Sequence, residues 1–296
     1  MKNMLGGIIY LESEWNHKEE LENLLYRIRQ EKPELEVFAL SSEKAGQGFA
    51  FSEEQEKRLS QLIESCLFLG TSKESLTLAR EYHLAVAGYE KMGKDTEEDF
   101  LPCEYLLSDL DQVNYELLER IYRRGHQIPW DILETPRCLV RELALSDLKE
   151  LFELYEHPEI TEFMEPLFDW DKELEYEKAY IKNMYGFFEY GMWLVFEKGT
   201  GKLIGRAGLE NREYPWGMEL ELGYAIHPDY WGKGYATEVC TACLSYAAEN
   251  LDYGYINCLI ERENNASIAL ARKLGFQCQG EVTFTGKAMQ HYRREL

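Results

Sequence analysis

The sequence has little positive charge for its size. Its 296 residues include 32 lysines and arginines against 54 aspartates and glutamates, which gives a formal net charge of −22 at pH 7. Proteins that bind nucleic acid neutralise phosphates with clusters of lysine and arginine, so this composition argues against a nucleic-acid partner. The acidic excess either keeps the protein soluble or attracts cationic small molecules and basic peptides.

The sequence also lacks long apolar runs and a full set of metal-binding cysteines. The seven cysteines are an odd number, and most of them lie in apolar segments. Cys240 and Cys243 fall on one face of an expected helix, and a zinc site would require a second pair at suitable spacing. No run is long enough to cross a membrane, and the first apolar stretch is too short for a signal peptide. We therefore expect reduced, mostly buried thiols, no metal, no membrane and a cytoplasmic protein.

Short apolar runs alternate with amphipathic segments in the first half. Strands are expected at residues 7–11, 35–40, 66–70, 84–89 and 105–107, and helices at 18–30, 52–64, 73–82 and 112–124. Strands that alternate with helices indicate a parallel sheet covered on both faces. Residues 1–125 are thus predicted to form a small α/β domain, doubly wound and Rossmann-like. Residues 126–136, which contain Pro129 and Pro136, are predicted to be a linker.

The second half, residues 137–296, has a different pattern that predicts a mixed α+β domain. The expected strands lie at residues 138–142, 192–197, 203–209, 218–226 and 255–260, the helices at 146–156, 171–185, 237–250 and 266–274, and a terminal hairpin follows.

The most informative segment is a strand that leads through a glycine loop into a helix. The loop reads Trp231-Gly232-Lys233-Gly234-Tyr235-Ala236 and is followed by Thr237. Glycines let backbone N–H groups converge, and a helix N-terminus adds a partial positive charge. This arrangement suits an anion such as a pyrophosphate, although two glycines alone fit a ligand-free turn equally well.

Residues 137–296 resemble the GNAT superfamily of N-acetyltransferases, and within it the ribosomal-protein-type branch. Besides the loop, the resemblance is carried by Arg141-Glu142 with Ser146-Asp147, by Gly205, by Asn264-Asn265-Ala266-Ser267 and by Lys273-Leu274-Gly275-Phe276. It implies direct transfer of an acetyl group from acetyl-CoA to a primary amine of a small molecule, peptide or protein. Trp231 stands where the superfamily has Gln or Arg, a departure that is similar to the ribosomal-protein-type branch.

The resemblance also implies which residues bind acetyl-CoA. Backbone amides from Gly232 to Ala236, which include those of Lys233, Gly234 and Tyr235, are expected to hold the pyrophosphate. Thr237 is expected to cap the helix and touch phosphate. The backbone of Tyr224, Ala225 and Ile226 is expected to pair with the pantetheine arm like an added strand. Asn264 and Ser267 are expected to contact the cofactor, and a capping or packing role is the alternative for Ser267.

Two carboxylates are candidates for the general base. An amine attacks a thioester only when neutral, and a lysine-like amine near pKa 10.4 is neutral about once in 2,500 molecules at pH 7. Glu219 and Glu221 alternate with apolar residues and so share one face of the strand at 218–226. They are either bases or carboxylates that are solvated or paired across strands, and Glu221 is favoured as the base because it lies closer to the expected splay point. His227, just before Pro228, is either a proton relay or a surface histidine at the end of the strand.

An aromatic and acidic stretch at residues 163–190 is placed by the resemblance beside the acceptor site. An acidic wall with aromatic rings would suit a cationic amine, whereas aromatic residues at helical spacing also serve as core. The rival function is a CoA-binding sensor or scaffold with a decayed transferase site, because the loop residues fit both.

The first half resembles, over about 60 residues, the haloacid-dehalogenase-like phosphohydrolases. Cys66-Leu67-Phe68-Leu69-Gly70-Thr71-Ser72 follows that family's strand-and-turn pattern, with Thr71 where the family has Asp. The strand at residues 7–11 lacks the family's Asp pair, so phosphoryl chemistry is not expected. The resemblance implies a non-catalytic remnant.

Overall fold

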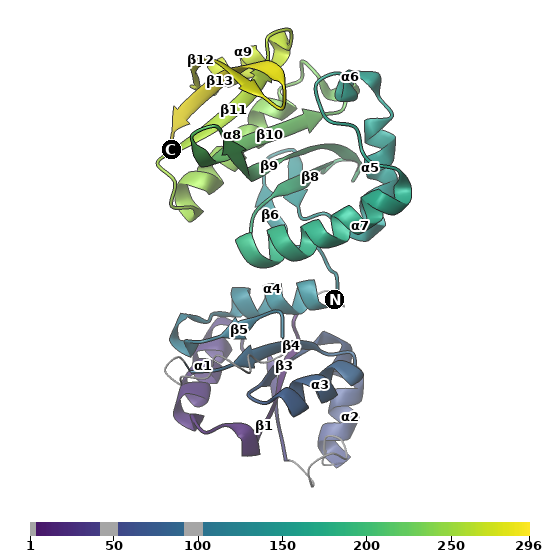
Figure 1. Ribbon diagram of the computed structural model, residues 1–296. Coiled ribbons are helices and arrows are strands. Elements are labelled where there is room, and N and C mark those ends of the chain that lie inside the picture. Colours follow the sequence, from purple (N-terminus) through teal and green to yellow (C-terminus); the bar gives the residue numbers. More distant parts are fainter. Residues whose placement is uncertain (1–3, 42–52, 92–102) are drawn as a thin grey trace. The chain divides into compact units, whose positions relative to one another are not determined.

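The computed structural model describes residues 4–41, 53–91 and 103–296. The chain divides into two compact units, Met1–Trp130 and Asp131–Leu296 (Figure 1). The second unit has one hydrophobic core, and the first has two apolar clusters, one on each side of its sheet.

The first unit is a parallel five-stranded sheet with helices on both faces, as the sequence predicts. The strands pair in the order β2-β1-β3-β4-β5, and every pair is parallel. The elements are β1 (Gly7–Leu11), α1 (Lys18–Glu31), β2 (Glu36–Leu40), α2 (Glu53–Leu62), β3 (Cys66–Gly70), α3 (Lys73–Glu81), β4 (Ala85–Tyr89), β5 (Leu106–Leu107) and α4 (Tyr115–Gly125), with short 3-10 turns η1 (Glu12–Glu14), η2 (Ile63–Ser65) and η3 (Leu110–Gln112).

Successive side chains of its strands point to opposite faces and build the two clusters. Ile8 packs with α1 and α4, whereas the next residue, Ile9, packs with α2 and α3. The near-continuous apolar strands of this half are therefore buried on both sides, as in other parallel sheets.

Protein side chains fill the edge of this sheet at the ends of β1, β3 and β4. Such an edge is where open α/β sheets bind ligands. The Trp15 ring stacks on Tyr89 at 5.3 Å between centroids and is 3% exposed. Thr71 donates to the Glu14 carbonyl at 3.0 Å, and Ser72 donates to the Glu14 carboxylate at 2.8 Å. Thr71 stands where the haloacid-dehalogenase-like phosphohydrolases have an aspartate. Its hydrogen bond joins the turn after β1 to the turn after β3.

The second unit is built on an eight-stranded mixed sheet in the order β12-β13-β11-β10-β9-β8-β7-β6. Its elements are β6 (Asp131–Glu134), β7 (Cys138–Arg141), η4 (Leu145–Asp147), α5 (Leu148–Tyr155), α6 (Pro158–Thr161), α7 (Trp170–Tyr180), the π-helix η5 (Ile181–Phe188), β8 (Met192–Glu197), β9 (Leu203–Tyr214), β10 (Gly217–Ile226), η6 (Pro228–Tyr230), α8 (Tyr235–Asn250), β11 (Tyr255–Glu261), α9 (Asn265–Lys273), β12 (Gln277–Phe284) and β13 (Lys287–Glu295).

Part of the segment predicted as linker is an edge strand. The boundary between the two units falls between Trp130 and Asp131, inside that segment. The strand β6 begins at Asp131 and pairs antiparallel with β7. The sequence pattern missed β6 because only Ile132 and Leu133 are apolar in its four residues, and both are only partly buried. The second unit therefore begins six residues before the predicted boundary.

Helices cover both faces of this sheet. On one face Tyr180 of α7 donates to Glu210 of β9 at 2.9 Å, and α5 packs against α7 through Phe152 and Trp170. On the other face Tyr246 of α8 contacts Trp193 of β8, and α9 contacts β10. Cross-strand partners lie on the same face of a sheet, so Glu219 and Glu221 of β10 share the α7 face with Arg212 and Glu210 of β9.

The helix predicted at residues 171–185 changes its winding at Tyr180. It is α-helical through α7 and continues as the π-helix η5. Tyr180 and Tyr185 are five residues apart and both buried, with ring centroids 5.5 Å apart. The wider π turn brings residues at this spacing onto one side, which an α-helix would not do.

In the described part of the chain, no helix is long and apolar enough to cross a membrane.

Candidate functional site

The glycine loop joins β10 to α8 and has the backbone geometry of an anion cradle. Gly232 and Gly234 have φ of 69° and 85°, a region that favours glycine. The helix begins at Tyr235 with Gly234 at its N-cap, so the expectation that Thr237 caps the helix is wrong. Thr237 lies in the first turn, where its hydroxyl accepts a hydrogen bond from Lys273 at 3.3 Å.

This helix start leaves backbone donors for a ligand. The first N–H groups of an α-helix have no partner within the helix, and Gly234 has no side chain to cap them. A Cβ built on Gly232 would meet nothing within 4 Å, so the loop is open on that side. Lys233 is exposed between the two glycines and adds a positive charge. These groups fit the pyrophosphate of CoA.

Trp231 and His227 have structural partners beside the loop. The Trp231 indole donates to the Ile226 carbonyl at 2.5 Å while half of the side chain stays exposed. The Ile226 carbonyl is thus already engaged, so its backbone offers less to a pantetheine arm than predicted. The His227 ring accepts from the Asp229 N–H at 3.1 Å, and burial lowers its pKa.

The strands β10 and β11 separate directly after Glu221. β10 pairs with β9 along its whole length, but the only β10–β11 partners in the described residues are Glu221 and Asn257. Beyond Glu221 the β11 side of β10, which includes Tyr224 to Ile226, has no strand partner in the described residues. An extended pantetheine arm fits such an unpaired edge.

Helix α9 contacts this open edge. The Tyr224 hydroxyl donates to the Ser267 carbonyl at 3.4 Å. The Asn264 side chain accepts from the Ser267 N–H at 3.0 Å and so caps α9. The structure thus places the Ser267 carbonyl beside Tyr224 and gives the Asn264 side-chain oxygen a capping role.

Glu219 is saturated by neighbours. Its carboxylate, 9% exposed, accepts from Trp216 at 2.7 Å, Tyr255 at 3.0 Å, Asn257 at 2.7 Å and Arg293 at 2.9 Å. Four donors from three segments therefore occupy the oxygens of this carboxylate. The alternative of a carboxylate paired across strands therefore holds for Glu219.

Glu221 has fewer partners and lies at the splay point. Its carboxylate accepts from Tyr214 at 2.7 Å and pairs with Arg212 at 3.0 Å. Burial raises the pKa of Glu221, and this effect exceeds the opposing influence of Arg212 and Tyr214. A carboxylate with a raised pKa holds a proton more readily, which suits a general base.

The α7 face holds arginines that neutralise its carboxylates. Besides the Arg212 pair, Arg206 lies 3.5 Å from Glu177, and both side chains are buried. Burial raises the pKa of Glu177 to about 7. The wall next to the site is therefore less acidic than the sequence suggested. Arg206, Glu210 and Arg212 are separated by even numbers of residues along β9, so they share one face of the strand. This periodicity was the signal in the sequence that could have placed the arginines beside these carboxylates.

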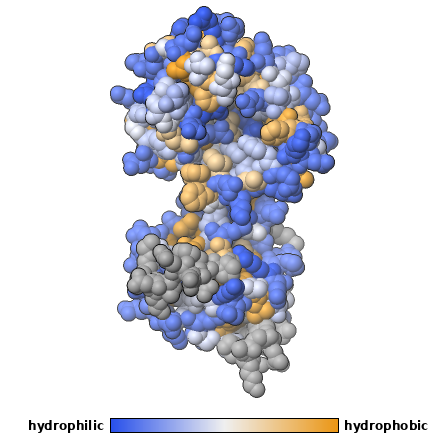
Figure 2. All heavy atoms as spheres, in the orientation of Figure 1, coloured by the Kyte–Doolittle hydropathy of each residue, from blue (hydrophilic) through white to orange (hydrophobic). Residues whose placement is uncertain are grey.

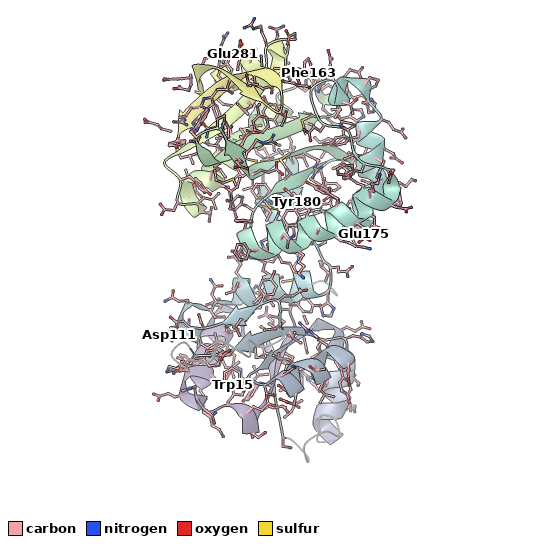
Figure 3. All side chains as sticks on the ribbon, viewed as in Figure 1. Trp15, Asp111, Phe163, Glu175, Tyr180 and Glu281 are labelled. Atoms are coloured by element: carbon pink, nitrogen blue, oxygen red, sulfur yellow. The ribbon has the colours of Figure 1, made fainter. Side chains whose placement is uncertain are left out.

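The aromatic residues of the stretch at 163–190 divide into core and surface. Tyr180 and Tyr185 are buried, and Figure 3 labels Tyr180 between α7 and the sheet. Phe187 is 78% exposed and Trp170 48%. Hydrophilic residues dominate the face in Figure 2, with apolar residues scattered among them.

Five of the seven cysteines are buried, and all are free thiols. The described residues contain no group of three or more metal-ligating side chains.

Known proteins match the second unit. Residues 137–277 match the model of the acetyltransferase (GNAT) domain. YkkB, an uncharacterized protein of Bacillus subtilis, is 28% identical over 164 residues, which cover 55% of this chain and 95% of YkkB. The uncharacterized N-acetyltransferase YoaA of Bacillus subtilis is 28% identical over 154 residues, 50% of this chain and 84% of YoaA.

A solved structure has the same fold. The apo form of RimL, a ribosomal alpha-N-protein acetyltransferase, is 18% identical and superposes with a TM-score of 0.50. The match covers 58% of this chain and 98% of RimL, and it shows the fold alone.

The matches and the strand–loop–helix geometry define an enzyme of the acyl-CoA N-acyltransferase class. Its second unit is an acetyltransferase domain of the GNAT superfamily, whose members use acetyl-CoA.

Proposed function

We propose that this enzyme transfers the acetyl group of acetyl-CoA directly to a primary amine bound on the α7 face beside Glu221. One observation carries the proposal. The unpaired edge of β10 connects the glycine loop to Glu221, so a pantetheine arm on that edge would end at the carboxylate.

The proposed reaction uses few residues. The amides of the glycine loop hold the pyrophosphate, and the β10 edge orients the arm. The amine nitrogen attacks the thioester carbonyl carbon, and Glu221 takes the proton that the amine loses. The C–S bond then breaks, and the departing thiolate takes up a proton from Glu221 or from solvent, so that CoA leaves as a thiol. A thioester acyl donor and a positioned base suffice for this chemistry, so no acyl-enzyme is required.

A cationic acceptor, either a small molecule or a peptide, fits the proposal. Exposed rings such as Phe168, Trp170 and Tyr176 lie on or next to α7 and can contact a cation. Spermidine N(1)-acetyltransferase of Escherichia coli is 34% identical over 62 residues, 21% of this chain and 33% of that enzyme. We place the reaction in the cytoplasm, where buried thiols stay reduced.

Release of free thiol from acetyl-CoA tests the function. We expect the full-length protein to acetylate at least one member of a panel of spermidine, other polyamines, lysine-containing peptides and peptides with free N-termini. Mass spectrometry of the product would identify the modified amine. Acetyl-CoA binding without turnover on any amine would support the alternative, a CoA-binding sensor or scaffold.

The pH dependence tests whether Arg212 tunes Glu221. Arg212 favours the charged carboxylate and so lowers the pKa of Glu221 against the effect of burial. In Arg212→Met that influence is lost, the pKa of Glu221 rises further, and the acidic limb of kcat/KM should move to higher pH. The loss should be largest at low pH and vanish where Glu221 is ionised in both proteins.

Arg212→Lys is the matched control because it keeps the positive charge, and its profile should stay near wild type. Superimposable profiles for Arg212→Met and wild type would remove Glu221 from the ionisations that govern the rate.

A further inference from the structure

The turn between β6 and β7 contacts the glycine loop through Arg137. The Arg137 guanidinium donates to the Lys233 carbonyl at 2.9 Å and to the Glu238 carboxylate at 2.7 Å. It also lies over the Tyr235 ring, with 4.0 Å between the guanidinium carbon and the centroid. One side chain thus contacts the loop, the first residue of α8 and the first turn of that helix.

Glu238 holds this arginine in place. Its carboxylate accepts from the Arg137 backbone N–H at 2.9 Å and from Thr135 at 2.7 Å. Burial alone would raise the pKa of Glu238, but the hydrogen bonds from Thr135 and Arg137 keep that pKa below its usual range. The turn at residues 135–137 is therefore fastened to the helix that carries the loop.

The bond to Lys233 determines where an amide of the loop points. The Lys233 carbonyl and the Gly234 N–H belong to one planar trans peptide and point in opposite directions. Because Arg137 holds the carbonyl on one side, the Gly234 N–H is directed to the other. Glycines on both sides of Lys233 have φ of 69° and 85° and would otherwise leave this peptide free to rotate.

We infer that Arg137 is a positioning residue for acetyl-CoA, which keeps the glycine loop in its anion-binding conformation and adds a positive charge beside it. The inference rests on the proposed function, because it takes the loop to be the pyrophosphate site. A preorganised loop pays no ordering entropy when the ligand binds, so Arg137 affects affinity for acetyl-CoA rather than the acyl-transfer step.

Steady-state kinetics of the full-length protein and calorimetry with acetyl-CoA test this inference. Arg137→Met keeps the length of the side chain but removes its charge and donors. We expect its KM and Kd for acetyl-CoA to rise about tenfold or more, with kcat at saturation and the KM of the acceptor within about twofold of wild type. Arg137→Lys should recover part of the affinity because the charge remains.

Arg58→Met is the matched control, since Arg58 pairs with Glu36 at 2.8 Å in the first unit. Its affinity for acetyl-CoA should equal that of wild type. If Arg137→Met does not fold, Glu238→Gln replaces it, because that change releases Arg137 without deleting it and should raise the KM several-fold.

The outcomes separate the inference from the function on which it rests. Wild-type binding of acetyl-CoA together with unchanged affinity in the folded variants would overturn the role of Arg137 alone. Wild-type protein that binds no acetyl-CoA would overturn the proposed function and this inference together. A decrease of kcat with unchanged KM would also contradict the inference, because a positioning role in acetyl-CoA binding predicts the reverse.

Discussion

Gly234→Val should weaken acetyl-CoA binding by more than tenfold while the protein stays folded. Gly234 has φ of 85°, which a β-branched residue adopts only with strain of about 1–3 kcal/mol. A Cβ at this position would lie in ordinary contact with the Arg137 guanidinium, at 3.5 Å, so the γ-methyl groups of valine would extend beside the group that holds the Lys233 carbonyl. Valine therefore both reorients the Gly234 amide and places methyl groups beside the cradle. Calorimetry with acetyl-CoA measures the effect, and circular dichroism confirms the fold.

Gly201→Val controls for the backbone strain. Gly201 has φ of 70° in the turn between β8 and β9, and a Cβ there meets nothing within 4 Å. This variant should lose similar stability and keep its affinity for acetyl-CoA. Unchanged affinity in a folded Gly234→Val protein would disprove the assignment of the loop to the pyrophosphate.

Glu221→Gln should lower turnover by roughly 100-fold or more at neutral pH on an acceptor that the amine panel identifies. The carboxylate lies at the splay of β10 and β11, and burial raises its pKa, so it is suited to accept the proton of the amine. Glutamine keeps the size of the side chain and a hydrogen-bond acceptor for Tyr214. The loss should shrink as pH rises, because a larger fraction of the amine is then neutral without a base. The pH–rate profile of the variant measures both effects.

Two neighbouring glutamates serve as controls for this prediction. Glu213 is exposed on the opposite face of β9, so Glu213→Gln should leave turnover unchanged. Glu219→Gln replaces a carboxylate that accepts hydrogen bonds from four donors with a neutral amide, and so weakens those hydrogen bonds. The variant should therefore lower the midpoint of thermal unfolding more than it lowers turnover in the folded protein. A profile for Glu221→Gln that superimposes on wild type would end the assignment of Glu221 as the base.

The sequence by itself predicted most of the fold, because local patterns encode it. Apolar runs and amphipathic segments gave the parallel sheet of the first unit and most of its strand and helix positions. The strand, the two glycines and the following helix predicted the loop, because a backbone with positive φ requires particular residues at particular positions. These features depend on residues that are close together in the chain, so the sequence pattern is sufficient to predict them. The four-residue strand β6 was missed, because two apolar residues between two charged ones do not distinguish a short strand from a linker.

Only the tertiary structure distinguished Glu219 from Glu221. Both alternate with apolar residues on one strand, and the sequence gives no means to separate them except their order. The Glu219 carboxylate accepts hydrogen bonds from Trp216 in the turn before β10, from Asn257 of β11 and from Arg293 of β13. Glu221 keeps two partners and lies where the sheet opens.

The same holds for the arginines. Arg137 lies nearly 100 positions from the loop carbonyl that it contacts. Arg206 pairs with Glu177 of the stretch that the sequence indicated as an acidic wall, and Arg212 pairs with Glu221. Charge and hydrogen-bond partners depend on distances between segments that are remote in the chain. Local pattern therefore fixes where the backbone turns, whereas the folded sheet decides which carboxylate has the capacity to take a proton.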